Sequence, residues 1–182
     1  MTFRVPGVLD ERTMPDTALR AAVLDGELYR IGEAYRSIDL PVDAAARAAS
    51  LERATGGGAI LAGRTAAWVW GVIPGLPEPR ERVIPPHRGI GHSPAPVLPG
   101  WRTRAVRLGA AEVALVGGVA VTTARRTAID LACADSSEDA WLAGLIALAG
   151  LSIEQLIDDL AARRRLRGRD AAIARLQLLV TR

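Results

Sequence analysis

The chain has 182 residues and a formal net charge of +3, and all 23 basic side chains are arginine because the sequence contains no lysine. It also lacks asparagine and has one cysteine, Cys133, and two histidines, His87 and His92. Mechanisms that need a lysine are therefore excluded, including a P-loop phosphate site, Schiff-base chemistry and a kinase catalytic loop. Zinc-finger spacing is also excluded. We predict no catalytic, cofactor-binding or metal-binding residue.

The length of the chain suits one domain with a small appendage. Charged residues interrupt the N-terminus, which therefore lacks the apolar core of a signal peptide. The longest apolar run, residues 141–151, is too short to span a bilayer and is interpreted as a buried helix. A lone cysteine is typical of a reducing compartment. These features predict a cytoplasmic protein with no membrane partner.

Charge is distributed unevenly along the chain. Residues 51–110 have a net charge of +5 and residues 161–182 of +6, whereas residues 111–160 have −6. Basic blocks are typical of contact with a phosphate backbone, and the acidic block could face a cationic protein. The alternative is that the acidic block and the basic blocks pair with each other within the fold. Charge alone does not decide between them.

The N-terminal residues predict a truncated winged-helix module over residues 1–40. Thr13 is expected to cap a helix that ends at Asp25-Gly26. Residues 27–31 and 34–38 then bracket Gly32-Glu33, which is the spacing of a hairpin with a two-residue loop. Residues 1–12 leave little room for the helices that would precede a recognition helix and wing.

Residues 41–182 predict a mixed α/β domain whose C-terminal part is helical, so the fold class is α/β (α+β). The expected strands are 59–61, 82–84 and 101–108, and a hairpin is expected from 112–116 and 119–121 around Gly117-Gly118. The expected helices are 42–54, 64–71, 123–134, 138–149, one from residue 152 into the arginine run, and 169–180. Trp68 is expected to anchor the core, and Trp70 to be covered by the proline-rich loop that follows it.

The segment from Val119 to Ala132 is the most informative part of the chain. A β-branched run ends in Thr122 and Thr123, either of which could cap the next helix. That helix opens with Arg125 and Arg126, a charge that opposes the helix dipole. An acidic partner, or Asp130 one turn after Arg126, is therefore expected. The plain structural interpretation is a strand-to-helix corner held by a threonine cap and an Arg–Asp pair.

Three segments, in this order, resemble the AbiEi-type antitoxins: L-R-A-A-V-L-D-G-E-L-Y-R-I-G-E-A-Y-R (19–36), R-T-A-A-W-V-W-G (64–71) and V-T-T-A-R-R-T-A-I-D-L-A (121–132). Those bacterial proteins counter a nucleotidyltransferase-like toxin and often repress their own operon. This chain departs from the pattern at Glu33, where such wings usually carry arginines.

The resemblance implies a noncatalytic antitoxin-like protein that neutralises a nucleotidyltransferase-like toxin, represses its own operon by DNA binding, or does both. The implied partners are that toxin and promoter DNA. A second copy of the chain, in a homodimer, is a further possible partner. The implied nucleic-acid-binding residues are Arg20, Arg30, Arg36, Arg163, Arg164, Arg165, Arg167 and Arg169. The family-motif residues, with a structural or partner-binding role, are Thr123, Arg125, Arg126, Thr127 and Asp130.

The alternative is an orphan protein-interaction domain that has lost DNA binding. Such a domain would bind a basic partner through an acidic surface. The residues of that surface would be Glu138, Asp139, Glu154, Asp158 and Asp159.

Overall fold

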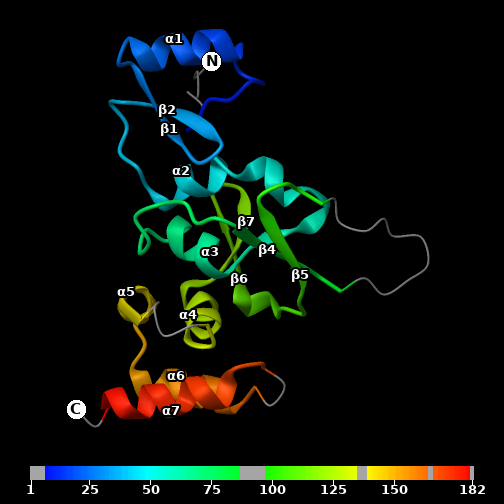
Figure 1. The fold of residues 1–182 in the computed structure, drawn as a ribbon, viewed down its shortest axis with the longest axis vertical. Coiled ribbons are helices and arrows are strands. Elements are labelled where there is room, and N and C mark those ends of the chain that lie inside the picture. The colour runs from blue at the N-terminus through cyan, green and yellow to red at the C-terminus, as the bar shows by residue number, and fades with distance from the viewer. Residues whose placement is uncertain (1–6, 87–96, 135–138, 164–165, 181–182) are drawn as a thin grey trace.

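The computed structural model describes residues 7–86, 97–134, 139–163 and 166–180. The fold is a mixed α/β fold, as predicted. Figure 1 shows the chain passing from a helix-and-hairpin unit at one end, through a mixed sheet, to a pair of helices at the other end.

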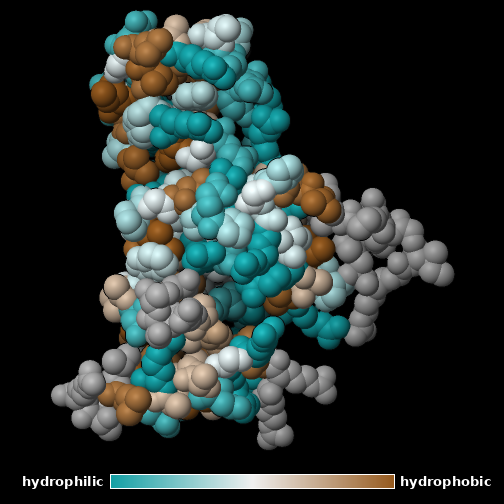
Figure 2. Space-filling model, viewed as in Figure 1, coloured by the Kyte–Doolittle hydropathy of each residue, from teal (hydrophilic) through white to brown (hydrophobic). Residues whose placement is uncertain are grey.

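The N-terminal unit has the helix-then-hairpin order that the sequence predicts. It comprises α1 (Asp16–Leu24), β1 (Leu28–Ile31) and β2 (Ala34–Ser37), and the two strands are antiparallel. Thr13 is not the helix cap, because α1 begins after Pro15 without a side-chain cap. The Thr13 hydroxyl instead donates to the Asp10 carbonyl at 2.6 Å and closes the preceding turn. Figure 2 shows apolar surface along one edge of this unit. Leu24 and Ile38 are exposed large apolar residues of the unit.

A five-stranded mixed sheet forms the centre of the molecule, with strand order β5-β4-β3-β7-β6. The β3–β4 and β6–β7 pairs are antiparallel, whereas β3–β7 and β4–β5 are parallel. The strands are β3 (Ile60–Leu61), β4 (Arg80–Ile84), β5 (Trp101–Ala105), β6 (Val113–Val116) and β7 (Val119–Thr122). The short helices of this region are α2 (Ala44–Ala49), the 3-10 helices η1 (Glu52–Gly58) and η2 (Ala110–Glu112), and α3 (Gly63–Val69).

The predicted helix over 42–54 is wrong in its second half. Asp43 caps α2 by accepting from the amide of Ala46 at 2.7 Å. The helix ends at Ser50, whose hydroxyl donates to the carbonyl of Arg47 at 2.7 Å. A side chain that bonds locally to the backbone competes with helix continuation, and the chain goes on as 3-10 helix.

Four helices complete the chain: α4 (Ala124–Ala132), α5 (Asp139–Ala149), α6 (Ile153–Ala161) and α7 (Arg169–Val180). Ser152 and Gln155 cap α6 reciprocally, each accepting from the other's backbone amide. In the described part of the chain no single helix is long and apolar enough to cross a membrane. Only α5 and α6 taken together pass that test, and they are bent by 97°.

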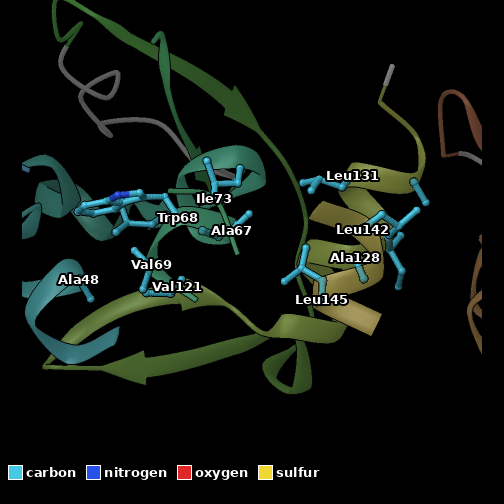
Figure 3. Packing of buried hydrophobic residues seen from close by; sticks show 14 of the residues in the cluster. Ala48, Ala67, Trp68, Val69, Ile73, Val121, Ala128, Leu131, Leu142 and Leu145 are labelled. Carbon is cyan, nitrogen blue, oxygen red and sulfur yellow. The ribbon is translucent and has the colours of Figure 1, made fainter. Parts of the chain in front are cut away.

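The core is continuous from the sheet to the C-terminal helices. Trp68 is 5% exposed, which confirms it as a core anchor. Trp70 is half-buried, and its Nε1 donates to the Thr122 carbonyl at 2.9 Å, so it ties α3 to the end of β7. Figure 3 shows residues of α3 beside β7, and residues of α5 beside α4: Ala67, Trp68, Val69, Val121, Ala128, Leu131, Leu142 and Leu145.

Candidate functional site

The corner between β7 and α4 is built by three threonines. Thr123 caps α4 by accepting from the amide of Arg126 at 3.2 Å. The hydroxyl of Thr127 lies 2.9 Å from the Thr123 carbonyl and 2.9 Å from the Thr122 hydroxyl. Thr122 and Thr127 are fully buried. The hydroxyls of Thr122, Thr123 and Thr127 therefore satisfy each other and the local backbone.

Arg126 connects two carboxylates, one on its own helix and one just before β6. Its Nε lies 3.0 Å from Asp130 Oδ1, and its Nη1 lies 2.8 Å from Glu112 Oε1. The side chain of Arg126 is 7% exposed and that of Asp130 is 12% exposed. The predicted (i, i+4) pair is thus confirmed, and the additional acidic partner is Glu112 at the end of η2.

The two carboxylates have different electrostatic surroundings. Burial by itself raises the pKa of Glu112, but the Gly109 amide, Arg126 and Arg163 together bring that pKa below its usual range. Burial raises the pKa of Asp130 above its usual range, against the opposing effect of Arg126. For Arg126, burial acts to lower the pKa, but Asp130 and Glu112 together raise it. Glu112 is therefore the better-stabilised anion.

Among the described residues, the acidic block 111–160 and the basic block 161–182 pair with each other at two points. Arg163 Nη2 lies 2.8 Å from Glu112 Oε1, and Arg175 Nε lies 3.3 Å from Asp139 Oδ1. Arg125 makes a bidentate contact with Asp159, at 2.6 and 2.7 Å, which fastens α4 to α6. Two ion pairs thus join the acidic block to the C-terminal basic block, as one of the two sequence-based alternatives predicts, and the pair of Arg125 with Asp159 lies within the acidic block.

The acidic surface predicted over 138–159 is smaller than expected. Asp139 and Asp159 are engaged in the ion pairs above, and Glu138 lies outside the described residues. Glu154 and Asp158 are exposed, one turn apart on α6. They form the described exposed part of that surface, which we call the α6 acidic face.

The N-terminal arginines are in three different situations. Arg20 is exposed and pairs with Asp16 at 2.8 Å, and Arg30 is exposed on β1. Arg36 is 7% exposed, and its guanidinium donates to the carbonyl of Gly7. The assignment of Arg36 to nucleic-acid contact is therefore corrected, because its charged group points into the protein.

The tip of the hairpin packs against the rest of the chain. The Glu33 amide donates to the Ser50 carbonyl at 3.3 Å, and the Glu33 carboxylate lies 3.7 Å from Arg80. A Cβ added at Gly32 would lie 2.3 Å from the Ser50 hydroxyl oxygen, so the approach is close. The segment that would be the wing of a winged helix is therefore packed on α2 and β4.

The arginine run between α6 and α7 divides in a similar way. Arg163 binds Glu112, and Arg169 lies 2.6 Å from Asp170. Arg167 is exposed. Arg164 and Arg165 lie outside the described residues.

A cleft of about 590 Å³ opens beside the corner. Its walls come from the start of α3, strands β4 and β5, the end of α4 and the turn between α6 and α7. Four arginines line it: Arg64, Arg102, Arg104 and Arg167. Of these four, only Arg167 was predicted from the sequence as a site residue. Arg102 and Arg104 lie two residues apart in the strand predicted over 101–108, and the alternation of side chains along a strand was the available signal for the other wall.

Within the described residues, no three His, Cys, Asp or Glu side chains gather closely enough to hold a metal ion. His87 and His92 lie outside these residues. Comparisons of the chain with models of known protein families and with curated proteins find no match. The resemblance to AbiEi-type antitoxins stays a prediction.

Proposed function

We propose that the chain is a noncatalytic antitoxin-like protein that neutralises a nucleotidyltransferase-like toxin by direct contact, represses its own operon, or does both. The observation that supports this most is that the side chains of the motif residues bond to other groups of the protein. Thr123 and Thr127 bond to the backbone of the corner, and Arg126 bonds to Asp130 and Glu112. Groups engaged in this way suit a scaffold that presents surfaces to a macromolecular partner.

The α6 acidic face is the proposed contact for the toxin. A protein that handles nucleic acid has a basic face, and complementary potentials steer encounter and discriminate against other partners. Glu154 and Asp158 are exposed and one helical turn apart, so both can meet the same partner surface. The ion pairs of Asp139 and Asp159 leave these two carboxylates as the ones to test.

The second candidate function is a protein-interaction domain that has lost DNA binding. It is favoured by the burial of Arg36 and by the packing of Gly32-Glu33 against Ser50 and Arg80. DNA recognition through the hairpin would require that tip to leave its present contacts. The two candidates share the α6 acidic face but differ in the response to operator DNA.

Co-expression of the full chain with a nucleotidyltransferase-like protein from the adjacent reading frame tests the proposal. Growth rescue is expected from the wild type and from a control that removes two exposed acids of the N-terminal unit, Asp25→Asn with Glu27→Gln. It should be lost or weakened in Glu154→Gln with Asp158→Asn. No rescue by the wild type, together with no repression of a reporter under its own promoter, would refute the antitoxin proposal. Rescue without repression would show that the chain neutralises the toxin by direct contact and would contradict only the DNA-binding part of the proposal.

A further inference from the structure

The cleft beside the corner carries more positive charge than its own carboxylates neutralise. Two acids, Glu81 and Asp130, line the cleft together with the four arginines. Glu81 accepts from the backbone amide of Arg64 at 2.9 Å, and its other oxygen lies 3.7 Å from Arg102. Asp130 is held by Arg126, which is not part of the lining. Both carboxylates therefore have partners already.

Two of the lining arginines have donors to spare. Within the described residues, neither Arg104 nor Arg167 makes an ion pair or a side-chain hydrogen bond, although Arg104 is near enough to Asp130 to favour the ionised carboxylate. Both side chains are exposed at the cleft. A guanidinium offers five donors in a planar fork that matches the oxygens of a phosphate group.

The backbone places these arginines on two different walls. Arg102 and Arg104 are two residues apart on β5, so their side chains point to the same side of the strand. Arg167 is brought to the other wall by Gly168, which has a φ of +80°. A Cβ at Gly168 would lie 2.7 Å from the carbonyl oxygen of Cys133, so only glycine allows the α6–α7 turn to approach the end of α4 this closely.

One part of the lining is apolar. Leu131, Cys133, Ala134 and Leu166 contribute to it, next to the charged walls. A cleft of several hundred Å³ that combines apolar surface with a few polar groups has the size and character of small-molecule sites. A ligand that fits both parts has a phosphate end and a less polar body.

We propose that this cleft binds a phosphate-bearing small molecule of nucleotide size. Arg102, Arg104 and Arg167 hold its phosphate groups, and the surface of Cys133 and Leu166 contacts its less polar part. This site is separate from the α6 acidic face, so it does not depend on the proposed toxin contact.

Calorimetric titration of the full chain at low salt tests the proposal, with a nucleoside triphosphate, inorganic tripolyphosphate and the unphosphorylated nucleoside as separate probes. The triphosphate and tripolyphosphate should bind and compete with each other, and the nucleoside should not. Each of Arg104→Gln and Arg167→Gln should weaken binding about tenfold or more, since a hydrogen bond to a charged group is lost. Arg107→Gln is the matched control, because Arg107 is exposed just after β5 but does not line this cleft.

A second variant separates position from charge. Gly168→Ala keeps every arginine but displaces the turn that carries Arg167, so it should weaken the triphosphate as Arg167→Gln does. Thermal melting without ligand checks that each variant is folded. Equal binding in wild type, Arg104→Gln and Arg167→Gln would overturn the proposal, as would an equal loss in Arg107→Gln. Binding of a single-stranded oligonucleotide without binding of either phosphate probe would also overturn it, in favour of a nucleic-acid path.

Discussion

Arg126 and Asp130 face each other across one turn of α4, with 3.0 Å between Nε and Oδ1, and the side chain of Arg126 is buried while that of Asp130 is 12% exposed. Removing one partner of a buried pair costs about 3–5 kcal/mol, because the other charge stays desolvated. Asp130→Ala leaves Arg126 with Glu112, so we expect a smaller loss of unfolding free energy, about 2 kcal/mol. Arg126→Ala leaves two carboxylates without their shared cation, so we expect the full range of about 3–5 kcal/mol.

Urea denaturation followed by far-ultraviolet circular dichroism measures both losses. Arg125→Ala is the matched control on the same helix, because its pair with Asp159 is largely exposed on the arginine side and should contribute about 0–1 kcal/mol. Wild-type midpoints for both Asp130→Ala and Arg126→Ala would show that the buried pair does not stabilise the corner.

Glu112 predicts a pH dependence of stability. Its pKa is lower in the folded protein than its usual value, so the folded state binds this proton less tightly than the unfolded state. The stabilisation is therefore present above the usual glutamate range and is lost as the pH falls through the lowered pKa. The difference in unfolding free energy between wild type and Glu112→Gln should be largest near neutral pH and shrink in acid.

The pKa of Asp130 is shifted in the opposite direction to that of Glu112, so Asp130 is the control for this pH dependence. Its pKa is raised by burial, so its contribution is greatest below the usual aspartate range and declines as the pH rises through the raised pKa. The stability of wild type relative to Asp130→Asn should therefore increase as the pH falls. Parallel pH profiles for wild type and Glu112→Gln would contradict the assignment of Glu112 as the stabilised anion.

Gly117 and Gly118 form the turn of the β6–β7 hairpin, with φ values of +58° and +84°. Alanine at either position pays about 1–2 kcal/mol for a left-handed conformation. At Gly117 the new Cβ would also lie 2.5 Å from the Ala45 carbonyl oxygen, whereas at Gly118 it meets nothing within 4 Å. We expect Gly117→Ala to lose about 1–3 kcal/mol more than Gly118→Ala, as overpacking does. Equal thermal midpoints for the two variants would contradict this contact.

Arg82 is a buried cation in the central sheet, 1% exposed. Its Nε donates to Thr103 Oγ1 at 2.9 Å, and its Nη1 donates to the Ala54 carbonyl at 2.5 Å, so it joins β4 to β5 and η1. Arg82→Met keeps much of the volume but leaves that carbonyl without this donor, and we expect a loss of about 2–3 kcal/mol in urea denaturation. Arg102→Met, on the exposed neighbouring strand, should change stability by less than about 0.5 kcal/mol. Similar losses in both variants would contradict this role of Arg82.

Elements set by local chemistry were predictable from the sequence. The hairpin at Gly117-Gly118, the cap at Thr123 and the pair of Arg126 with Asp130 each depend on residues within five positions of one another. The two wrong predictions, a helix cap at Thr13 and a helix that continues after Ala49, also have local causes. In both cases a hydroxyl donates to a nearby backbone carbonyl: Thr13 to Asp10, and Ser50 to Arg47.

The roles of the arginines were not predictable in the same way. Arg36, Arg82 and Arg163 look alike in the sequence, but each is held by a partner far along the chain: Gly7, Ala54 and Glu112. A composition with no lysine removes any contrast between arginines used for structure and arginines used for binding. Only the packing of strands and helices separates the two, and the same holds for the cleft, whose walls come from five parts of the chain.

The placement of the arginines also predicts how duplex DNA would bind. If the full chain binds the region upstream of its own gene, the logarithm of its affinity should fall linearly with the logarithm of salt concentration, by about 0.9 per phosphate contact. Arg30 and Arg167 are exposed, so Arg30→Gln and Arg167→Gln should each flatten the slope by about 0.9. Fluorescence anisotropy of a labelled duplex over a salt series measures these slopes.

Arg36→Gln separates structural from binding arginines in this experiment. The Arg36 guanidinium is buried against the carbonyl of Gly7, and one of its nitrogens lies 4.0 Å from Asp43. It therefore has no exposed donor side to offer a phosphate, and its replacement should lower the unfolding midpoint while leaving the salt slope at the wild-type value. A slope flattened by Arg36→Gln would mean that the N-terminal unit opens on DNA. Slopes unchanged in both Arg30→Gln and Arg167→Gln would remove these two residues from any DNA interface.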